Sequence, residues 1–156
     1  MPAVVRLLLA VALLAAAPAA AAELVAGIVV HVRDGDTIVV GRTPVRLWGV
    51  AAPERDGPLG RTATGFVRDR ALARHAVCTG DGSRSRDRVV ARCRIEGNDL
   101  GRALVAAGLA RDCPAFSGGA YAAFEPPDAP IRELYPLPPY CVPRRTAQLD
   151  GSSSTP

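Results

Sequence analysis

The chain contains no lysine, so all 19 of its basic residues are arginine. Arginine presents a planar guanidinium fork that can hold a phosphate group through two parallel hydrogen bonds. A compositional bias explains most of these arginines equally well. The formal net charge of +4 is compatible with a polyanionic partner but does not establish one.

The chain also lacks an apolar run long enough for a membrane anchor, which needs about 20 residues. Its apolar run at residues 7–17 follows Arg6 and precedes alanines that end at Ala22. A charged start, a short apolar stretch and small residues are typical of a secretory signal peptide. We therefore predict a signal peptide at 1–22 and export to the periplasm or the medium, without stable membrane association after cleavage. Loss of Arg6 lowers the formal charge to +3.

No Cys-x-x-Cys pair occurs, and His31 and His75 are the only histidines, so a zinc site has little support. The four cysteines are Cys78, Cys93, Cys113 and Cys141. In an exported chain they indicate a disulfide framework, for which three pairings are possible.

Three strands are predicted near the start of the mature chain. Segments 24–33 and 37–41 are rich in valine and isoleucine and are joined through Asp34-Gly35, a typical hairpin pattern. A turn then leads to a third strand at 45–50. The chain has no internal repeats and has room for one domain, so these strands indicate a meander or a small barrel.

Two further strands, 76–79 and 88–95, flank the polar loop 80–86. If they pair as a hairpin, Cys78 faces Cys93, and closing this loop would stabilise the fold by about 3 kcal/mol in the chain-entropy model. We therefore favour a Cys78–Cys93 disulfide.

Two helices are predicted from apolar residues that recur on one face. The first covers about 62–75 and is weakened by Gly65. The second follows the capping segment 97–99, has apolar residues at 100, 103, 104 and 107, and ends at Gly108.

From Asp112 onward, prolines and glycines exclude a long helix. We predict that 113–147 is an extension packed on the domain 23–112, and that Cys113–Cys141 tethers it. Residues 148–156 have the composition of a disordered tail.

Several motifs occur in a fixed order: Asp-Gly-Asp-Thr at 34–37, Arg-Leu-x-Gly-Val-x-Ala-Pro-Glu at 46–54, Arg-x-x-Ala at 88–91 and Leu-x-x-Ala-Leu-Val-x-x-Gly-Leu-Ala at 100–110. Together they resemble the thermonuclease, or staphylococcal nuclease-like, family over about residues 24–112. The resemblance implies a mainly β fold, a five-stranded OB-type barrel with helices. It also implies calcium-assisted hydrolysis of phosphodiester bonds in DNA and RNA.

For the metal, the resemblance matches Asp36 to a calcium-ligand aspartate and Asp34 to a neighbouring acid that supports the site. The backbone carbonyl of Ala52 is expected to be a further ligand. The family usually has a second aspartate ligand where this chain has Ala51. Because calcium affinity follows the number and charge of its ligands, we expect a weakened calcium site or a site for another divalent metal.

For catalysis, the resemblance matches Arg46 and Arg88 to the two catalytic arginines and Glu54 to the glutamate that engages the attacking water. Phosphodiester hydrolysis requires these types of residue, because water must lose a proton while negative charge accumulates on the phosphoryl oxygens. Taken separately, each residue also has a simpler interpretation. Asp34 and Asp36 can shape a turn, and Arg46 can lie on an exposed strand face. Glu54 can be a charge at the approach to a helix, and Arg88 is one of five arginines between 84 and 94, so its selection depends on the alignment.

Two further departures from the family concern substrate binding. The approach to Arg88 lacks the usual tyrosine and glycine, and Asp87 just before it could engage an arginine and draw it from the phosphate. A proline-rich tail replaces the long C-terminal helix, which leaves Phe116 as the nearest candidate for stacking on a base.

Our first hypothesis is therefore an exported, monomeric nuclease that acts on nucleic acid. The alternative is an OB-fold protein that binds nucleic acid or oligosaccharide without cleaving it. A small exported structural protein is a third possibility.

Overall fold

The computed structural model describes residues 22–144. Most of the predicted signal peptide and the predicted tail at 148–156 lie outside these residues. Within the described part, no helix is both long enough and apolar enough to cross a membrane.

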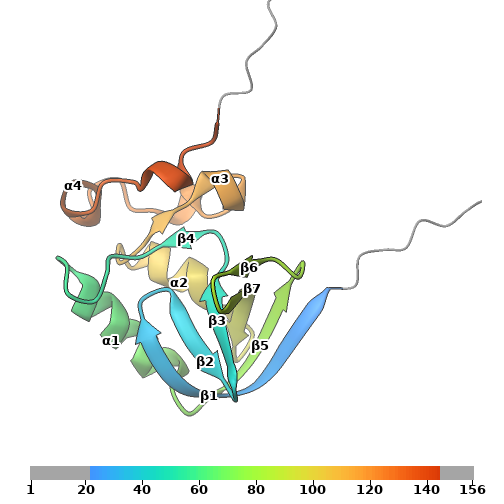
Figure 1. The fold of residues 1–156 in the computed structure, drawn as a ribbon. Coiled ribbons are helices and arrows are strands. Elements are labelled where there is room, and N and C mark those ends of the chain that lie inside the picture. Colours follow the sequence, from blue (N-terminus) through green and yellow to red (C-terminus); the bar gives the residue numbers. More distant parts are fainter. Residues whose placement is uncertain (1–21, 145–156) are drawn as a thin grey trace, which may run out of the picture.

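Five strands form a closed barrel, which confirms the predicted fold class (Figure 1). They are β1 (Glu23–Asp34), β2 (Thr37–Val40), β3 (Thr43–Leu47), β5 (His75–Gly80) and β7 (Arg88–Ile95). Their order is β3-β2-β1-β5-β7, and a parallel pairing between β3 and β7 closes the circle. The long β1 serves both halves, because its first part pairs with β5 and its second part with β2.

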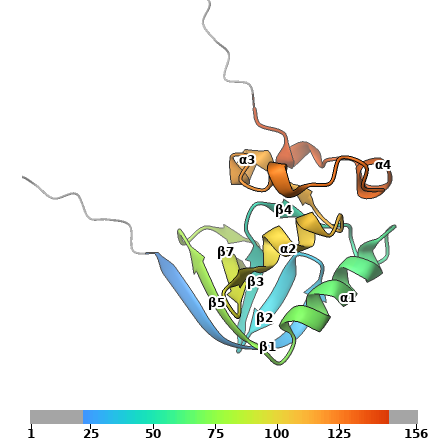
Figure 2. The same cartoon turned by 180° about the vertical axis from the view of Figure 1, so that it is seen from behind.

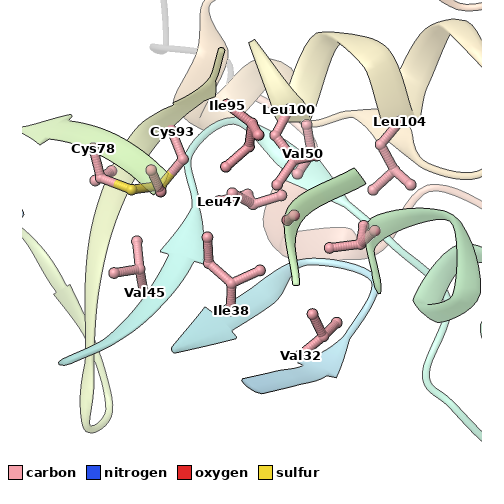
Figure 3. Packing of buried hydrophobic residues seen from close by; sticks show 14 of the residues in the cluster. Val32, Ile38, Val45, Leu47, Val50, Cys78, Cys93, Ile95, Leu100 and Leu104 are labelled. Carbon is pink, nitrogen blue, oxygen red and sulfur yellow. A yellow bond between two sulfur atoms is a disulfide. The ribbon is translucent and has the colours of Figure 1, made fainter. Parts of the chain in front are cut away.

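The interior of the barrel is filled mainly by valine, isoleucine and leucine side chains, to which β5 adds Ala76 and Cys78 (Figure 3). Helix α1 (Gly60–Ala71) adds Ala63 and Val67 to this core. Helix α2 (Leu100–Ala106) adds Leu100 and Leu104, and the Asp99 carboxylate caps it by accepting from the Arg102 backbone N–H at 3.0 Å.

The structure joins Cys78 to Cys93 and Cys113 to Cys141, the pairs expected from the sequence. Cys78 and Cys93 lie directly opposite each other on β5 and β7, and both side chains are buried in the core (Figure 3).

The predicted third strand, 45–50, is wrong at its end. Strand β3 stops at Leu47, because Gly49 adopts a φ of 72° and turns the chain out of the barrel. The short β4 (Val50–Ala51) then pairs with β9 (Arg111–Asp112) in a separate two-stranded sheet. The first helix also ends earlier than predicted, at Ala71, because His75 already begins β5. Two further short strands are β6 (Arg84–Ser85) and β8 (Asn98–Asp99).

The C-terminal segment, residues 113–144, contains two helices beyond the two predicted. They are α3 (Pro114–Ser117) and α4 (Ile131–Leu134), and the 3-10 turns are η1 (Ala122–Phe124) and η2 (Pro139–Cys141). Each helix is one turn long and starts at or just after a proline, which fits the N-terminal but not the central positions of a helix. Figures 1 and 2 show this segment stacked beyond β4, on the side away from the barrel.

Candidate functional site

One cleft of about 700 Å³ brings the predicted site residues together. It lies where the barrel meets the C-terminal segment, so strand, loop and segment residues all line it. The predicted residues on its wall are Asp34, Asp36, Arg46, Ala52, Glu54, Arg88 and Phe116.

The turn between β1 and β2 places Asp36 in this cleft. A Cβ atom on Gly35 would lie 2.9 Å from the Cβ atoms of both Ala52 and Ala63, so only glycine lets the turn approach so closely. The Asp34 carboxylate fixes the turn by accepting from the Asp36 backbone N–H at 3.0 Å. Asp34 and Asp36 therefore shape the turn and also line the cleft, so their two interpretations are compatible.

The Asp36 carboxylate is only 7% exposed and is surrounded by donors. Arg46 Nη1 donates to its Oδ2 at 2.6 Å, and the Thr37 hydroxyl donates to Oδ1 at 2.9 Å. Burial raises the pKa of Asp36 to about 6; Arg46 opposes this rise and Asp34 adds to it. For Arg46, burial lowers the pKa, but the combined attraction of Asp36 and Tyr140 makes the net shift upward.

The second arginine, Arg88, is held by Ser85, which lies on the short strand β6 just before strand β7. Arg88 Nε and Nη2 donate to the backbone and the hydroxyl of Ser85, at 3.2 and 3.1 Å. Its Nη1 donates to the Thr37 hydroxyl at 2.8 Å and lies 3.8 Å from Asp36 Oδ1. Thus two guanidinium groups converge on one carboxylate, an arrangement that can hold an anion such as a phosphate.

Asp87 directly precedes Arg88 in the sequence, but it does not draw Arg88 away from this cluster. Its carboxylate forms an ion pair with Arg33, at 2.9 Å on the barrel surface. The hydrogen bond with Arg33 lowers the pKa of Asp87.

Glu54 lies on the loop between β4 and α1, and its exposed side chain lines the cleft. Its backbone carbonyl accepts from the Gly57 N–H at 2.8 Å. A Cβ on Gly60 would overlap this same carbonyl, so the start of α1 packs directly against the backbone of Glu54. A carboxylate placed here can take a proton from a water molecule in the cleft.

The donors at this end of the cleft are oxygens, which suit a hard cation such as calcium. Asp34, Asp36 and Ala52 all line the wall. Among residues 22–144, however, no group of three or more His, Cys, Asp or Glu side chains could hold a metal. The oxygen donors here therefore supply little charge to retain a cation.

Ala51 packs against the C-terminal segment. It is fully buried and packs with the Cys113–Cys141 disulfide, Tyr135 and Leu137. A carboxylate at position 51 would lose its water in this apolar cluster. The segment thus covers the position at which the resemblance leads one to expect a second acid.

Sequence reasoning missed Thr37, Ser85 and Tyr140 as residues of the site. The motif at 34–37 contained a signal for Thr37, since it directly follows Asp36. Tyr140 directly precedes Cys141 and lines the cleft opposite the barrel. Its placement depends on a disulfide that joins residues 28 positions apart, so no local pattern could predict it.

The family model described as "Staphylococcal nuclease homologue" matches residues 44–122. The match covers half of the chain, including Arg46, Glu54 and Arg88, and it extends past the predicted domain end at 112 as far as η1. No curated protein matches the chain.

Proposed function

Because the chain belongs to the staphylococcal nuclease homologue family, we propose that it is a nuclease that hydrolyses phosphodiester bonds of DNA or RNA. The observation that carries this proposal is the meeting of Arg46, Arg88 and Glu54 in one cleft. These residues come from β3, β7 and a loop.

In the proposed reaction, the two arginines hold the phosphate through its non-bridging oxygens. Glu54 takes a proton from water while the water oxygen bonds to phosphorus and the bond to the leaving oxygen breaks. Negative charge that builds up on the phosphoryl oxygens is stabilised by the guanidinium groups, which Ser85, Thr37 and Asp36 already orient.

Asp36 and the Ala52 carbonyl would hold a calcium ion or another divalent cation, and Asp34 would support Asp36. Such a cation, when bound, would polarise the phosphate and lower the pKa of water. We expect weak affinity, because a single carboxylate ligand supplies little charge.

Export to the periplasm or the medium, as a monomer, belongs to the same proposal. It rests on the signal-like residues 1–22. Two disulfides support it, since such bonds persist mainly in oxidising compartments.

The test is cleavage of labelled single-stranded DNA and RNA by the oxidised mature protein, with calcium and with a chelator. We expect Glu54→Gln to lower the rate by about two orders of magnitude or more, as for loss of a general base. The matched control is Glu133→Gln, an exposed acid on α4 outside the cleft. Cleavage that survives Glu54→Gln unchanged would contradict the proposed role.

A second candidate is an OB-fold protein that binds nucleic acid or oligosaccharide without cleaving it. It is favoured by Ala51 and by the direct Asp36–Arg46 ion pair, which ties up both a metal ligand and a phosphate ligand. Salt-dependent binding of single strands, with no cleavage in calcium, magnesium or manganese, would support this candidate over the nuclease. A purely structural protein would show neither activity.

A further inference from the structure

Tyr140 lies on the C-terminal segment and lines the cleft across from the barrel residue Arg46. Of its surface, 54% stays exposed to solvent. Its phenol group lies close enough to contribute to the raised pKa of the Arg46 guanidinium. Arg46 is thus flanked by Asp36 on the barrel and by Tyr140 on the segment.

The segment holds Tyr140 in place through its covalent and apolar neighbours. Cys141, the next residue, is bonded to Cys113 and fully buried, and its backbone N–H donates to the Pro138 carbonyl at 2.9 Å. Pro138 and Pro139 restrict the backbone just before Tyr140. The disulfide therefore anchors the residue directly after Tyr140.

Tyr135 supports the same placement from the apolar side. It packs on Ala51 and the Cys113–Cys141 disulfide. Burial and the nearby Tyr140 both raise the pKa of Tyr135. Tyr135 therefore lies against the disulfide on one side and near Tyr140 on the other.

We propose that Tyr140 is a substrate-positioning residue, whose hydroxyl donates a hydrogen bond to the phosphate bound by Arg46, and that the Cys113–Cys141 disulfide delivers it to the site. The inference rests on the proposed function, since it names a residue that binds the same phosphate. A neutral phenol can donate to an anionic oxygen, and hydrogen bonds to charged groups are stronger than neutral ones.

The first experiment measures binding of a short single-stranded DNA by fluorescence anisotropy in chelator, so that affinity is independent of cleavage. We expect Tyr140→Phe to weaken binding about tenfold, the size of one hydrogen bond to a charged group. In the cleavage assay, KM should rise with kcat nearly unchanged. Tyr121→Phe is the matched control, because its hydroxyl bonds to buried Asp99 outside the cleft and its loss should leave DNA affinity unchanged.

The second experiment removes each disulfide in turn. Cys113→Ala with Cys141→Ala should weaken DNA binding as much as Tyr140→Phe, and adding Tyr140→Phe to that variant should cost nothing more. Cys78→Ala with Cys93→Ala should lower thermal stability but keep the affinity, because neither side chain lines the cleft. Circular dichroism checks that each variant folds.

Three outcomes would overturn the proposal or a part of it. An affinity of Tyr140→Phe within twofold of wild type overturns the role of the hydroxyl. Effects of Tyr140→Phe and of the disulfide variant that add independently overturn the role of the disulfide. If the wild-type protein binds no single-stranded DNA, the proposed function and this inference are both overturned. If the wild-type protein binds but Tyr140→Phe has no effect, this inference alone is overturned.

Discussion

At the residue scale, Asp36 combines burial with two positive neighbours. Its carboxylate lies 2.6 Å from Arg46 Nη1, yet burial still raises its pKa to about 6. The protonated form is therefore favoured at a higher pH than in an exposed aspartate. A cation that uses this carboxylate must compete with the proton as well as with the arginine.

This competition predicts the pH dependence of metal binding. Below about pH 6 a proton occupies Asp36, so calcium affinity should fall about tenfold per pH unit, and above pH 7 it should level off. Isothermal titration calorimetry at pH 5, 6, 7 and 8 measures this slope. Asp36→Asn is the control and should bind weakly at every pH. A wild-type affinity that stays constant from pH 5 to 8 would contradict the role of Asp36 as a ligand.

Local motifs predicted barrel residues that the structure places in one cleft, because their partners are close in sequence or lie on neighbouring strands. Arg46 on β3 pairs with Thr37, the residue after Asp36, so neighbouring strands bring together the two motifs on which the resemblance rests. The Arg33–Asp87 ion pair joins residues 54 positions apart, and the sequence did not predict it. The role of Tyr140 was not predicted either, because Tyr140 and Arg46 are far apart in the sequence and only folding brings them together.

At the element scale, the start of α1 sets the position of Glu54. The helix begins at Gly60, which is buried directly against the Glu54 carbonyl. The sequence predicted a helix here from its apolar face but placed its start two residues late. Periodicity indicates a buried face, whereas the first turn of this helix is determined by a contact with the preceding loop.

Gly60→Ala should therefore displace Glu54 without removing any functional group. We expect the cleavage rate to fall tenfold or more, because small displacements of a catalytic group are costly, and stability to drop by about 1–3 kcal/mol from overpacking. Gly65→Ala on the same helix is the matched control. Its Cβ meets nothing within 4 Å, so it should stabilise the helix by about 0.5–1 kcal/mol and leave activity intact.

At the scale of the whole molecule, the barrel and the C-terminal segment form the cleft together. The charged partners Arg111, Glu125 and Arg132 add to the disulfide: Glu125 Oε1 accepts from Arg111 at 2.8 Å and from Arg132 at 2.9 Å. The barrel could be predicted from strand periodicity and ordered motifs. The packing of the segment could not, because its short helices and proline turns carry no periodic pattern and are fixed by long-range contacts.

Ala51→Asp tests whether this packing excludes the second acid expected from the family. A carboxylate at position 51 would be buried against Cys113, Cys141 and Tyr135, and Arg111 opposite it on β9 is already paired with Glu125, so we expect a stability loss of about 3–5 kcal/mol. Calcium affinity and cleavage should not improve, because the side chain faces the apolar cluster. Ala123→Asp, at an exposed position, is the control and should change stability by less than about 0.5 kcal/mol. Urea unfolding and calcium titration measure both effects. If Ala51→Asp instead tightens calcium binding at unchanged stability, the C-terminal segment must move aside to admit the acid.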